Sequence, residues 1–207
     1  MKKENPFDNE VRNYEEWFKI NDQLLESELD AIYQVLPSTG TGIEIGVGTG
    51  IFASRTGVKF GIEPSQNMAE EAIRKGICVT IGTAEDLPAE DAAFDYAMMI
   101  TVDCFLSDLP KAFEEIHRIL KPDGILIIAF LDKATPLGAL YEKNKHLHES
   151  YKDAVFHTSS EMEIFLEQAD FIVQAKYQTI FSLENIYQKP IEGSGDGIFC
   201  VFSAKRK

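Results

Sequence analysis

The sequence has few basic residues and no long apolar run. It holds 34 aspartates and glutamates against 20 lysines and arginines, so the formal net charge of its 207 residues is −14. A surface this negative repels phosphate backbones and anionic bilayers, which argues against nucleic acids and membranes as partners. The longest apolar run, residues 125–131, is far shorter than the roughly 20 residues that a membrane-spanning helix needs.

Cysteine is also scarce, and the histidines form no clear ligand set. The three cysteines are far apart and odd in number, which argues against a disulfide framework or a CxxC metal site. His146, His148 and His157 lack a matching cluster of carboxylates or cysteines, so we expect surface histidines and no metal. The first ten residues lack the apolar segment of a signal peptide, and we expect a cytoplasmic protein.

Hydrophobic periodicity predicts a helical N-terminal segment followed by alternating strands and helices. Leu25, Leu29, Ile32 and Leu36 share one helical face. Strands are then expected at residues 43–45, 58–63, 78–81, 94–100 and 125–131, with helices at 66–75 and 109–120. Two further segments, 171–181 and 197–204, are typical of an antiparallel hairpin at the sheet edge. The pattern predicts an α/β protein with a mostly parallel seven-stranded sheet and helices on both faces.

A glycine-rich turn, Glu44-Ile-Gly46-Val-Gly48-Thr-Gly50, follows the first predicted strand and opens a helix. Glycines allow a tight turn and a close approach of a ligand to the backbone. Position 51 is isoleucine, so the G-x-G-x-x-G pattern of dinucleotide sites is absent, as is the Gly-Lys-Ser/Thr of a P-loop. A carboxylate at position 44 suits a cationic ligand better than a pyrophosphate.

A second acidic residue ends the next predicted strand. Glu63 lies 17 positions after Gly46, where its carboxylate can accept hydrogen bonds from both hydroxyls of an unphosphorylated ribose. The segment 82–88 follows the third strand and offers polar groups to an adenine ring. These features indicate a site for an adenosine-type ligand.

These blocks resemble the class I S-adenosylmethionine-dependent methyltransferases, in the small-molecule branch that includes type 11. The resemblance extends from about Tyr14 to Phe202 and rests on E-x-G-x-G-x-G, Glu63, A-E-D-L-P, F-D-Y-A-M-M-I and L-K-P-D-G-I-L-I-I in that order. It implies a three-layer Rossmann-like fold and S-adenosylmethionine as the cofactor. We expect residues 1–207 to form one domain, with residues 1–36 as a helical lid and 132–158 as a cap over the acceptor pocket.

The resemblance also implies which residues bind the cofactor. The turn with Gly46, Val47, Gly48 and Gly50 would line its methionine and ribose, and Glu44 would lie near its ammonium group. Its other contacts are expected from Glu63 on the ribose, Pro64 and the Ala84 N–H at the adenine, Ile100 and Thr101 at the sulfonium, and Tyr14 and Trp17 in the lid. Many relatives have aspartate where this chain has Thr83, so Glu85 or a backbone carbonyl is expected to accept from the adenine amino group.

Catalysis in this family needs little more than alignment for an in-line displacement. Asp103 follows the fourth strand and could orient or deprotonate the acceptor, although a role in a helix cap or turn fits equally well. Cys104 has no histidine near it in the sequence. We expect a small-molecule acceptor and either a monomer or a homodimer. The alternatives are a binding or regulatory protein that keeps the cofactor site without turnover, and a nicotinamide-dependent oxidoreductase, against which Ile51 argues.

Overall fold

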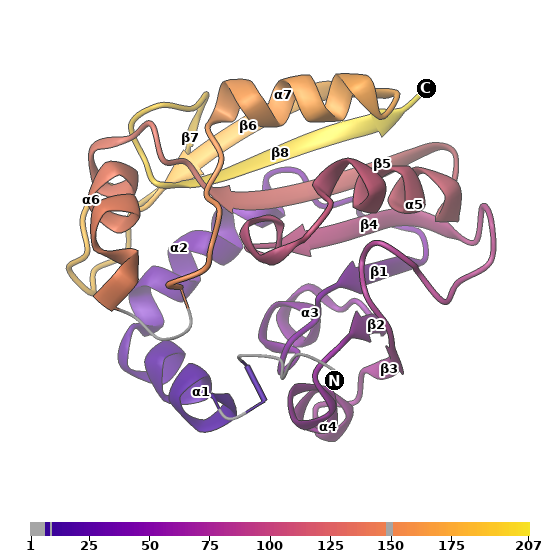
Figure 1. Ribbon diagram of the computed structural model, residues 1–207, viewed down its shortest axis with the longest axis horizontal. Coiled ribbons are helices and arrows are strands. Elements are labelled where there is room, and N and C mark those ends of the chain that lie inside the picture. Colours follow the sequence, from indigo (N-terminus) through magenta and orange to yellow (C-terminus); the bar gives the residue numbers. More distant parts are fainter. Residues whose placement is uncertain (1–6, 9, 148–150) are drawn as a thin grey trace.

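A single sheet of eight strands organises the protein, a computed structural model that describes residues 7–8, 10–147 and 151–207 (Figure 1). The strands lie in the order β3-β2-β1-β4-β5-β8-β6-β7. Their bounds are β1 Gly42–Ile45, β2 Phe60–Glu63, β3 Cys78–Ile81, β4 Phe94–Ile100, β5 Leu120–Leu131, β6 Phe171–Thr179, β7 Ile191–Glu192 and β8 Phe199–Arg206. The α/β class and the Rossmann-like arrangement are confirmed, with one strand more than expected.

The first five strands are parallel, as predicted. β4 begins and ends at the predicted residues. Its side chains pack alternately on the two faces of the sheet. β5 begins five residues earlier than expected. Its Leu120 pairs with Phe94 and its Ile125 with Tyr96, with a register shift between the two pairs. The turn chemistry of residues 121–124 therefore interrupts the strand without ending it.

The predicted antiparallel pair of β6 and β8 is confirmed, and the structure shows where the pair joins the sheet. β8 lies between β5 and β6 and is antiparallel to both. The segment that connects β6 to β8 contributes a two-residue strand, β7, which pairs with Tyr177 and Gln178 of β6. This eighth strand was not predicted, because two residues in a segment rich in glycine and proline show no alternation.

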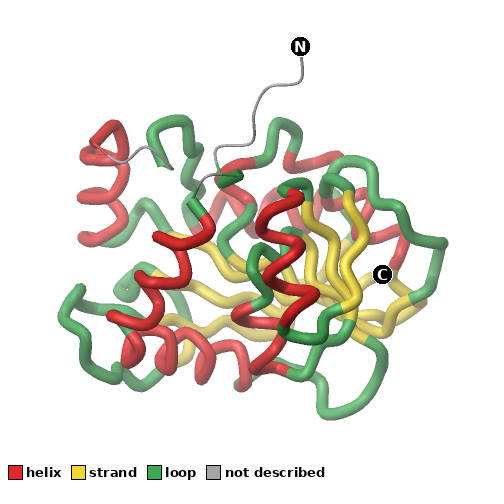
Figure 2. The backbone as a smooth tube through the Cα atoms, turned by 90° about the horizontal axis from the view of Figure 1, so that it is seen from below, coloured by secondary structure: helices red, strands yellow, loops and turns green. Residues whose placement is uncertain are grey.

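Helices cover both faces of the sheet (Figure 2). On one face lie α2 (Asp22–Tyr33), α3 (Ile51–Thr56) and α4 (Gln66–Arg74), and on the other lie α5 (Leu109–Ile119) and α7 (Ser159–Gln168). Within β4, Met98 packs on the face covered by α2, α3 and α4, and Met99 packs on the face covered by α5 and α7. Both side chains are fully buried. The predicted apolar stripe on α2 is confirmed, since Leu25, Leu29 and Ile32 are buried.

The elements outside these layers gather where the parallel strands end. In Figure 1 these strands point towards α1 (Val11–Ile20), α2 and α6 (Pro136–Asn144). Two short 3₁₀ helices, η1 (Asp103–Phe105) and η2 (Lys145–Leu147), complete this end. Ligands of open α/β sheets bind beyond the carboxyl ends of the strands. The fold therefore places α1, α2 and α6 at the end of the sheet where a ligand is expected.

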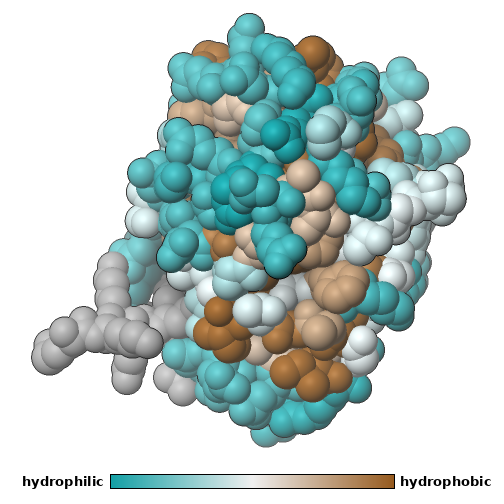
Figure 3. Space-filling view, turned by 90° about the vertical axis from the view of Figure 1, so that its right-hand side faces the viewer, coloured by the Kyte–Doolittle hydropathy of each residue, from teal (hydrophilic) through white to brown (hydrophobic). Residues whose placement is uncertain are grey.

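The opposite end, where the parallel strands begin, is largely hydrophilic with an apolar area low in the view of Figure 3. At this end of the sheet, the rings of Phe60 and Phe94, the first residues of β2 and β4, lie 6.0 Å apart, and Phe60 is 40% exposed. Within the described ranges, no helix is long and apolar enough to cross a bilayer.

Candidate active site

The glycine turn lies between β1 and α3 and takes the shape that the sequence predicts. Gly46, Gly48 and Gly50 have φ angles of +70°, +54° and +77°, a region that favours glycine. The N–H groups of Gly46 and Val47 donate to the carbonyl of Ile62, at 2.8 and 3.0 Å, which joins the turn to β2. The turn thus exposes its backbone at the carboxyl end of the sheet.

Glu63 joins the glycine turn to the start of α4. Its Oε2 accepts from the Gly48 N–H at 2.9 Å, and its Oε1 accepts from the Ser65 N–H at 2.8 Å. The residue is 6% exposed, and burial raises the pKa of its carboxyl although both hydrogen bonds lower it. Each oxygen still has a free lone pair, so the carboxylate is held rigidly and can accept further hydrogen bonds.

Glu44 places a second buried carboxyl below the turn. The residue is 1% exposed, and the nearby backbone N–H of Ala53 in α3 lowers the pKa of its carboxyl slightly. Its Oε2 has no hydrogen-bond partner within the described part of the chain. Burial raises the pKa of Glu44 well above its ordinary value, and the charge of Glu63 raises it further. A cation beside Glu44 would therefore offset an unfavourable burial.

The raised pKa of Glu44 predicts that its replacement stabilises the ligand-free protein. Above about pH 4.5 the carboxyl ionises readily in the unfolded chain, but burial opposes its ionisation in the folded one, so stability is lost as pH rises towards the folded pKa. We expect Glu44→Gln to raise the melting temperature at pH 8 by about 2–4 °C, the shift that about 1 kcal/mol gives in a domain of this size. Thermal melts from pH 4 to 8 measure this, and the gain should vanish at pH 4. A gain independent of pH would contradict the assignment.

The segment after β3 lies on the side where adenine is expected. Ala84 is buried, and Thr83 and Pro64 are exposed at the surface. Oε1 of Glu85 accepts from the N–H and the hydroxyl of Ser107, at 3.0 and 2.9 Å. The side chain thus ties this segment to the turn that precedes α5.

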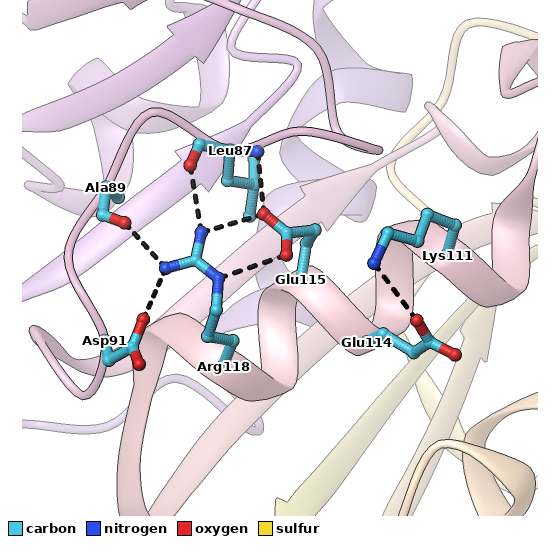
Figure 4. A network of polar contacts seen from close by, with 7 residues as sticks. All are labelled: Leu87, Ala89, Asp91, Lys111, Glu114, Glu115 and Arg118. Atoms are coloured by element: carbon cyan, nitrogen blue, oxygen red, sulfur yellow. Dashed lines mark hydrogen bonds and ion pairs between the residues drawn. The ribbon is translucent and has the colours of Figure 1, made fainter.

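Arg118 of α5 holds the rest of this segment in place (Figure 4). Its guanidinium donates to the carbonyls of Leu87 and Ala89 and forms ion pairs with Asp91 and Glu115. The Glu115 carboxylate also accepts from the Leu87 N–H at 3.0 Å. The segment is therefore ordered by side chains of α5.

The carboxyl end of β4 brings together two residues that the sequence separates widely. Asp103 is 2% exposed, and its Oδ2 lies 2.8 Å from Nδ1 of His157. Burial raises the pKa of Asp103, while the imidazole lowers it. Its Oδ1 is buried without a partner in the described residues. His157 was expected at the surface, and the structure corrects this. His146 is exposed as expected, and His148 lies outside the described residues.

Ile100 and Thr101 precede this pair at the end of β4. Ile100 is buried, and Thr101 has a φ angle of +53°, which is uncommon for a β-branched residue. The Thr101 N–H donates to the carbonyl of Ala129 in β5 at 2.7 Å, which fixes this conformation. Backbone held in sparsely populated regions is concentrated at functional sites.

Helix α1 covers the glycine turn through Tyr14. A Cβ built on Gly48 would lie 4.0 Å from the Tyr14 hydroxyl. Lys75 fastens the same helix, since its Nζ contacts Glu15 and donates to the Thr49 carbonyl at 2.8 Å. Trp17 lies on the same helix. It is 42% exposed, and its ring packs edge-on against Phe18 at 4.9 Å.

Comparison with known proteins identifies the family to which the chain belongs. A family model described as a methyltransferase domain matches residues 43–128. A solved structure from Thermotoga maritima, an SAM-dependent methyltransferase and possible histamine N-methyltransferase, is 40% identical with a TM-score of 0.94, and the match covers 98% of each chain. The chain is a class I SAM-dependent methyltransferase. It belongs to the type 11 branch, it is an enzyme, and its cofactor is S-adenosylmethionine.

Two further relatives of this methyltransferase match it over different shares of their own length. The uncharacterized protein MJ1123 of Methanocaldococcus jannaschii is 37% identical, over 98% of this chain and 99% of its own. The uncharacterized protein Rv2003c of Mycobacterium tuberculosis is 36% identical over 75% of this chain, which spans only 55% of that protein. The match to the archaeal relative extends beyond the methyltransferase domain model into the N-terminal helices and the C-terminal strands.

Proposed function

We propose that this methyltransferase acts on a small organic molecule and that its cofactor lies across the glycine turn, between Glu44 and Glu63. The unpartnered, buried oxygen of Glu44 is the main support, because a cationic amino group beside it would supply the missing partner. Glu63, on the other side of the turn, is suited to the ribose hydroxyls. The open space at Gly48 leaves room for a ligand against the backbone.

The remaining sequence-predicted residues are proposed to surround the same ligand. Val47 and the three glycines of the turn are proposed to line the base of the cofactor site. Pro64 and the backbone at Thr83 and Ala84 are placed at the adenine, with Glu85 only bracing this segment. Ile100 and Thr101 are placed at the sulfonium end, with Tyr14 above the turn. Trp17, on the same helix as Tyr14, is proposed to belong to the lid.

The cofactor supplies an activated methyl group, so the contribution of the protein is to align the acceptor and to exclude water. The N-terminal segment is proposed to act as the lid. Asp8 accepts from the Ser65 hydroxyl at 2.6 Å beside Glu63, and Phe7 packs on Phe105 of η1 with ring centroids 4.9 Å apart. The lid therefore reaches from the adenine side to the acceptor side. The segment 132–158 would close the acceptor side.

A small acceptor fits the charge of the protein and the family. A net charge of −14 disfavours nucleic-acid substrates. The possible histamine activity of the Thermotoga relative is also an activity on a small molecule. We propose that the protein works in the cytoplasm without a metal ion or a nucleic-acid partner.

Asp103 is proposed to orient the acceptor, with His157 as the residue that positions it. Asp103→Asn is expected to raise the KM for the acceptor about tenfold, the effect of about one lost charge-assisted hydrogen bond, while the Kd for the cofactor stays unchanged. Steady-state kinetics and calorimetric titration separate the two quantities. A changed cofactor Kd with an unchanged acceptor KM would refute this role.

Calorimetric titration with S-adenosylmethionine, S-adenosylhomocysteine and NAD tests the cofactor site. We expect micromolar binding of both sulfur nucleosides and none of NAD. A product assay with small-molecule, peptide and nucleic-acid acceptors then tests the acceptor class. Failure of S-adenosylmethionine to bind, or transfer only to macromolecules, would overturn the proposal.

A further inference from the structure

Lys75 connects helix α1 to the glycine turn. It is the C-cap residue of α4. Its Nζ lies 2.5 Å from Oε1 of Glu15 in α1 and donates to the Thr49 carbonyl at 2.8 Å, with the Thr49 hydroxyl at 3.4 Å. Thr49 stands between Gly48 and Gly50 in the turn. One ammonium group therefore holds both a carboxylate of α1 and the backbone of the proposed cofactor turn.

This ion pair is partly shielded from solvent. The Lys75 side chain is 28% exposed and that of Glu15 is 23% exposed. Burial raises the pKa of Glu15, but hydrogen bonds with Lys75 and Thr49 outweigh burial, and the pKa lies below its ordinary value. The carboxylate is therefore charged at neutral pH, and its contact with the ammonium is less screened than that of a fully exposed pair.

Helix α4 gives the contact a rigid base. Three of its side chains are buried, and a Cβ on Gly50 would lie 3.1 Å from Ala72, so α4 packs closely on the turn. At the start of α4, the Ser65 hydroxyl donates to the Asp8 carboxylate at 2.6 Å, and the Asn67 amide donates to the Asp8 carbonyl at 2.7 Å. Helix α4 therefore holds the N-terminal segment at two places, one near each of its ends.

Helix α1 depends on such contacts because it adds no fully buried residue to the core. In Figure 1 it lies outside the layers that pack on the sheet. Its Phe18 ring meets Phe52 of α3 edge-on at 5.7 Å. Asn21 joins α1 to α2 and has a non-helical backbone, with φ −107° and ψ 44°. Elements with few buried apolar contacts open at a low free energy, so α1 is able to rotate about Asn21 once its contacts with α4 break.

The contact of Glu15 also sets the direction in which Tyr14 points. Successive residues of an α-helix project about 100° apart around its axis. Fixing Glu15 on Lys75 therefore fixes the rotation of α1, and with it the Tyr14 hydroxyl, which would lie 4.0 Å from a Cβ on Gly48. A cofactor on the turn would have this hydroxyl as a neighbour.

We propose that the Lys75–Glu15 pair is a latch that holds α1 over the bound cofactor and positions Tyr14. Its opening sets the rate at which S-adenosylmethionine enters and S-adenosylhomocysteine leaves. The proposal rests on the proposed function, because it takes the cofactor to lie on the same turn. Lys75 is a positioning residue, since it acts through Glu15 and Thr49. Lid opening limits turnover in many enzymes, so the latch is also expected to influence kcat.

Lys75→Met tests the latch, because it removes the ammonium and keeps most of the side-chain length. We expect S-adenosylhomocysteine to dissociate on the order of tenfold faster, since a charge-assisted contact of the closed state is lost. Chasing radiolabelled ligand with an excess of unlabelled ligand measures this rate. Trp17 is the single tryptophan of the chain and lies in α1, so its fluorescence after mixing with the ligand follows the helix. We expect a smaller fluorescence change in Lys75→Met.

Further variants separate the ion pair from a merely structural role of Lys75. Glu15→Gln breaks the same pair from α1 and should speed release equally, and the double variant should release no faster than either single one. Lys75→Arg keeps the charge and should release nearly as slowly as the native protein. Raising the ionic strength from about 0.01 to about 1 M shortens the Debye length about tenfold. It should speed release from the native protein but not from Lys75→Met.

Arg74→Met is the matched control, because Arg74 is in the same turn of α4 but pairs with Glu70 and Glu71 of its own helix. It should release the ligand at the native rate. If thermal melts show that Lys75→Met is unfolded, Glu15→Gln decides alone.

The outcomes separate the latch from the cofactor site. Native release rates in Lys75→Met and Glu15→Gln, or an equal increase in Arg74→Met, would overturn the latch and leave the cofactor site standing. Failure of the native protein to bind either sulfur nucleoside would overturn the proposed cofactor site, and the latch with it.

Discussion

Glu63→Ala is expected to abolish tight binding of S-adenosylmethionine, with a Kd raised on the order of 100-fold or more. The substitution removes the proposed acceptor of both ribose hydroxyls, and each hydrogen bond to a charged group contributes about 1.5–3 kcal/mol. It also leaves the N–H groups of Gly48 and Ser65 without their partner. Calorimetric titration with S-adenosylmethionine and S-adenosylhomocysteine measures the effect.

Two variants control this result. Glu70→Ala removes an exposed carboxylate from α4 and should bind the cofactor as the native protein does. Glu63→Gln keeps an acceptor oxygen and should fall between the native protein and the alanine variant. Circular dichroism of Glu63→Ala confirms that it is folded. A folded Glu63→Ala with native affinity would show that the ribose lies elsewhere.

Gly48→Val is expected to leave the protein folded while raising the cofactor Kd more than 100-fold. The Cβ of the added side chain would lie 4.0 Å from the Tyr14 hydroxyl, an ordinary van der Waals distance, and within 4 Å of no other described atom. It therefore costs the fold only the strain of a positive φ, about 1–2 kcal/mol, but occupies the surface where we place the cofactor. Gly46→Val should behave differently, because its Cβ would lie 2.5 Å from a methyl group of Val102. We expect its melting temperature to fall by about 6–12 °C, from a loss of about 3 kcal/mol.

Gly57→Val separates the effect of backbone strain at positive φ from the effect of a side chain that blocks the proposed cofactor site. Gly57 ends α3 with a φ of +82° and has no atom within 4 Å of its Cβ position. This variant therefore carries the strain of Gly48→Val away from the site and should bind S-adenosylmethionine normally. Thermal melts and titrations of the three variants together make the comparison. Equal loss of affinity in Gly48→Val and Gly57→Val would contradict the proposed position of the cofactor.

The elements that the sequence predicts well are those with a strong local signal. β4 has its predicted bounds because both of its faces are buried and its apolar run is continuous. The glycine turn is equally local, since backbone conformations with positive φ limit the choice of residue. Five parallel strands and an antiparallel pair follow from the spacing of such segments.

The parts that could not be predicted depend on partners far away in the chain. His157 lies 54 positions from Asp103, and nothing around either residue indicates the contact. The contact of Glu85 with Ser107 is of the same kind, because Ser107 lies 22 positions away, after the next strand.

The position of β8 has a consequence for how the sheet is assembled. Strand β8 pairs with β5 over seven residues and with β6 over eight, and it follows β5 by 67 residues in the sequence. The five parallel strands precede it and can pair as soon as they have been synthesised. Until residues 199–206 emerge, however, the seven residues of β5 that pair with β8 form an unpaired edge, a template for pairing with other chains. Such non-local pairing is also slow to form. Synthesis of the last strand therefore closes the period in which the nascent chain is most exposed to aggregation.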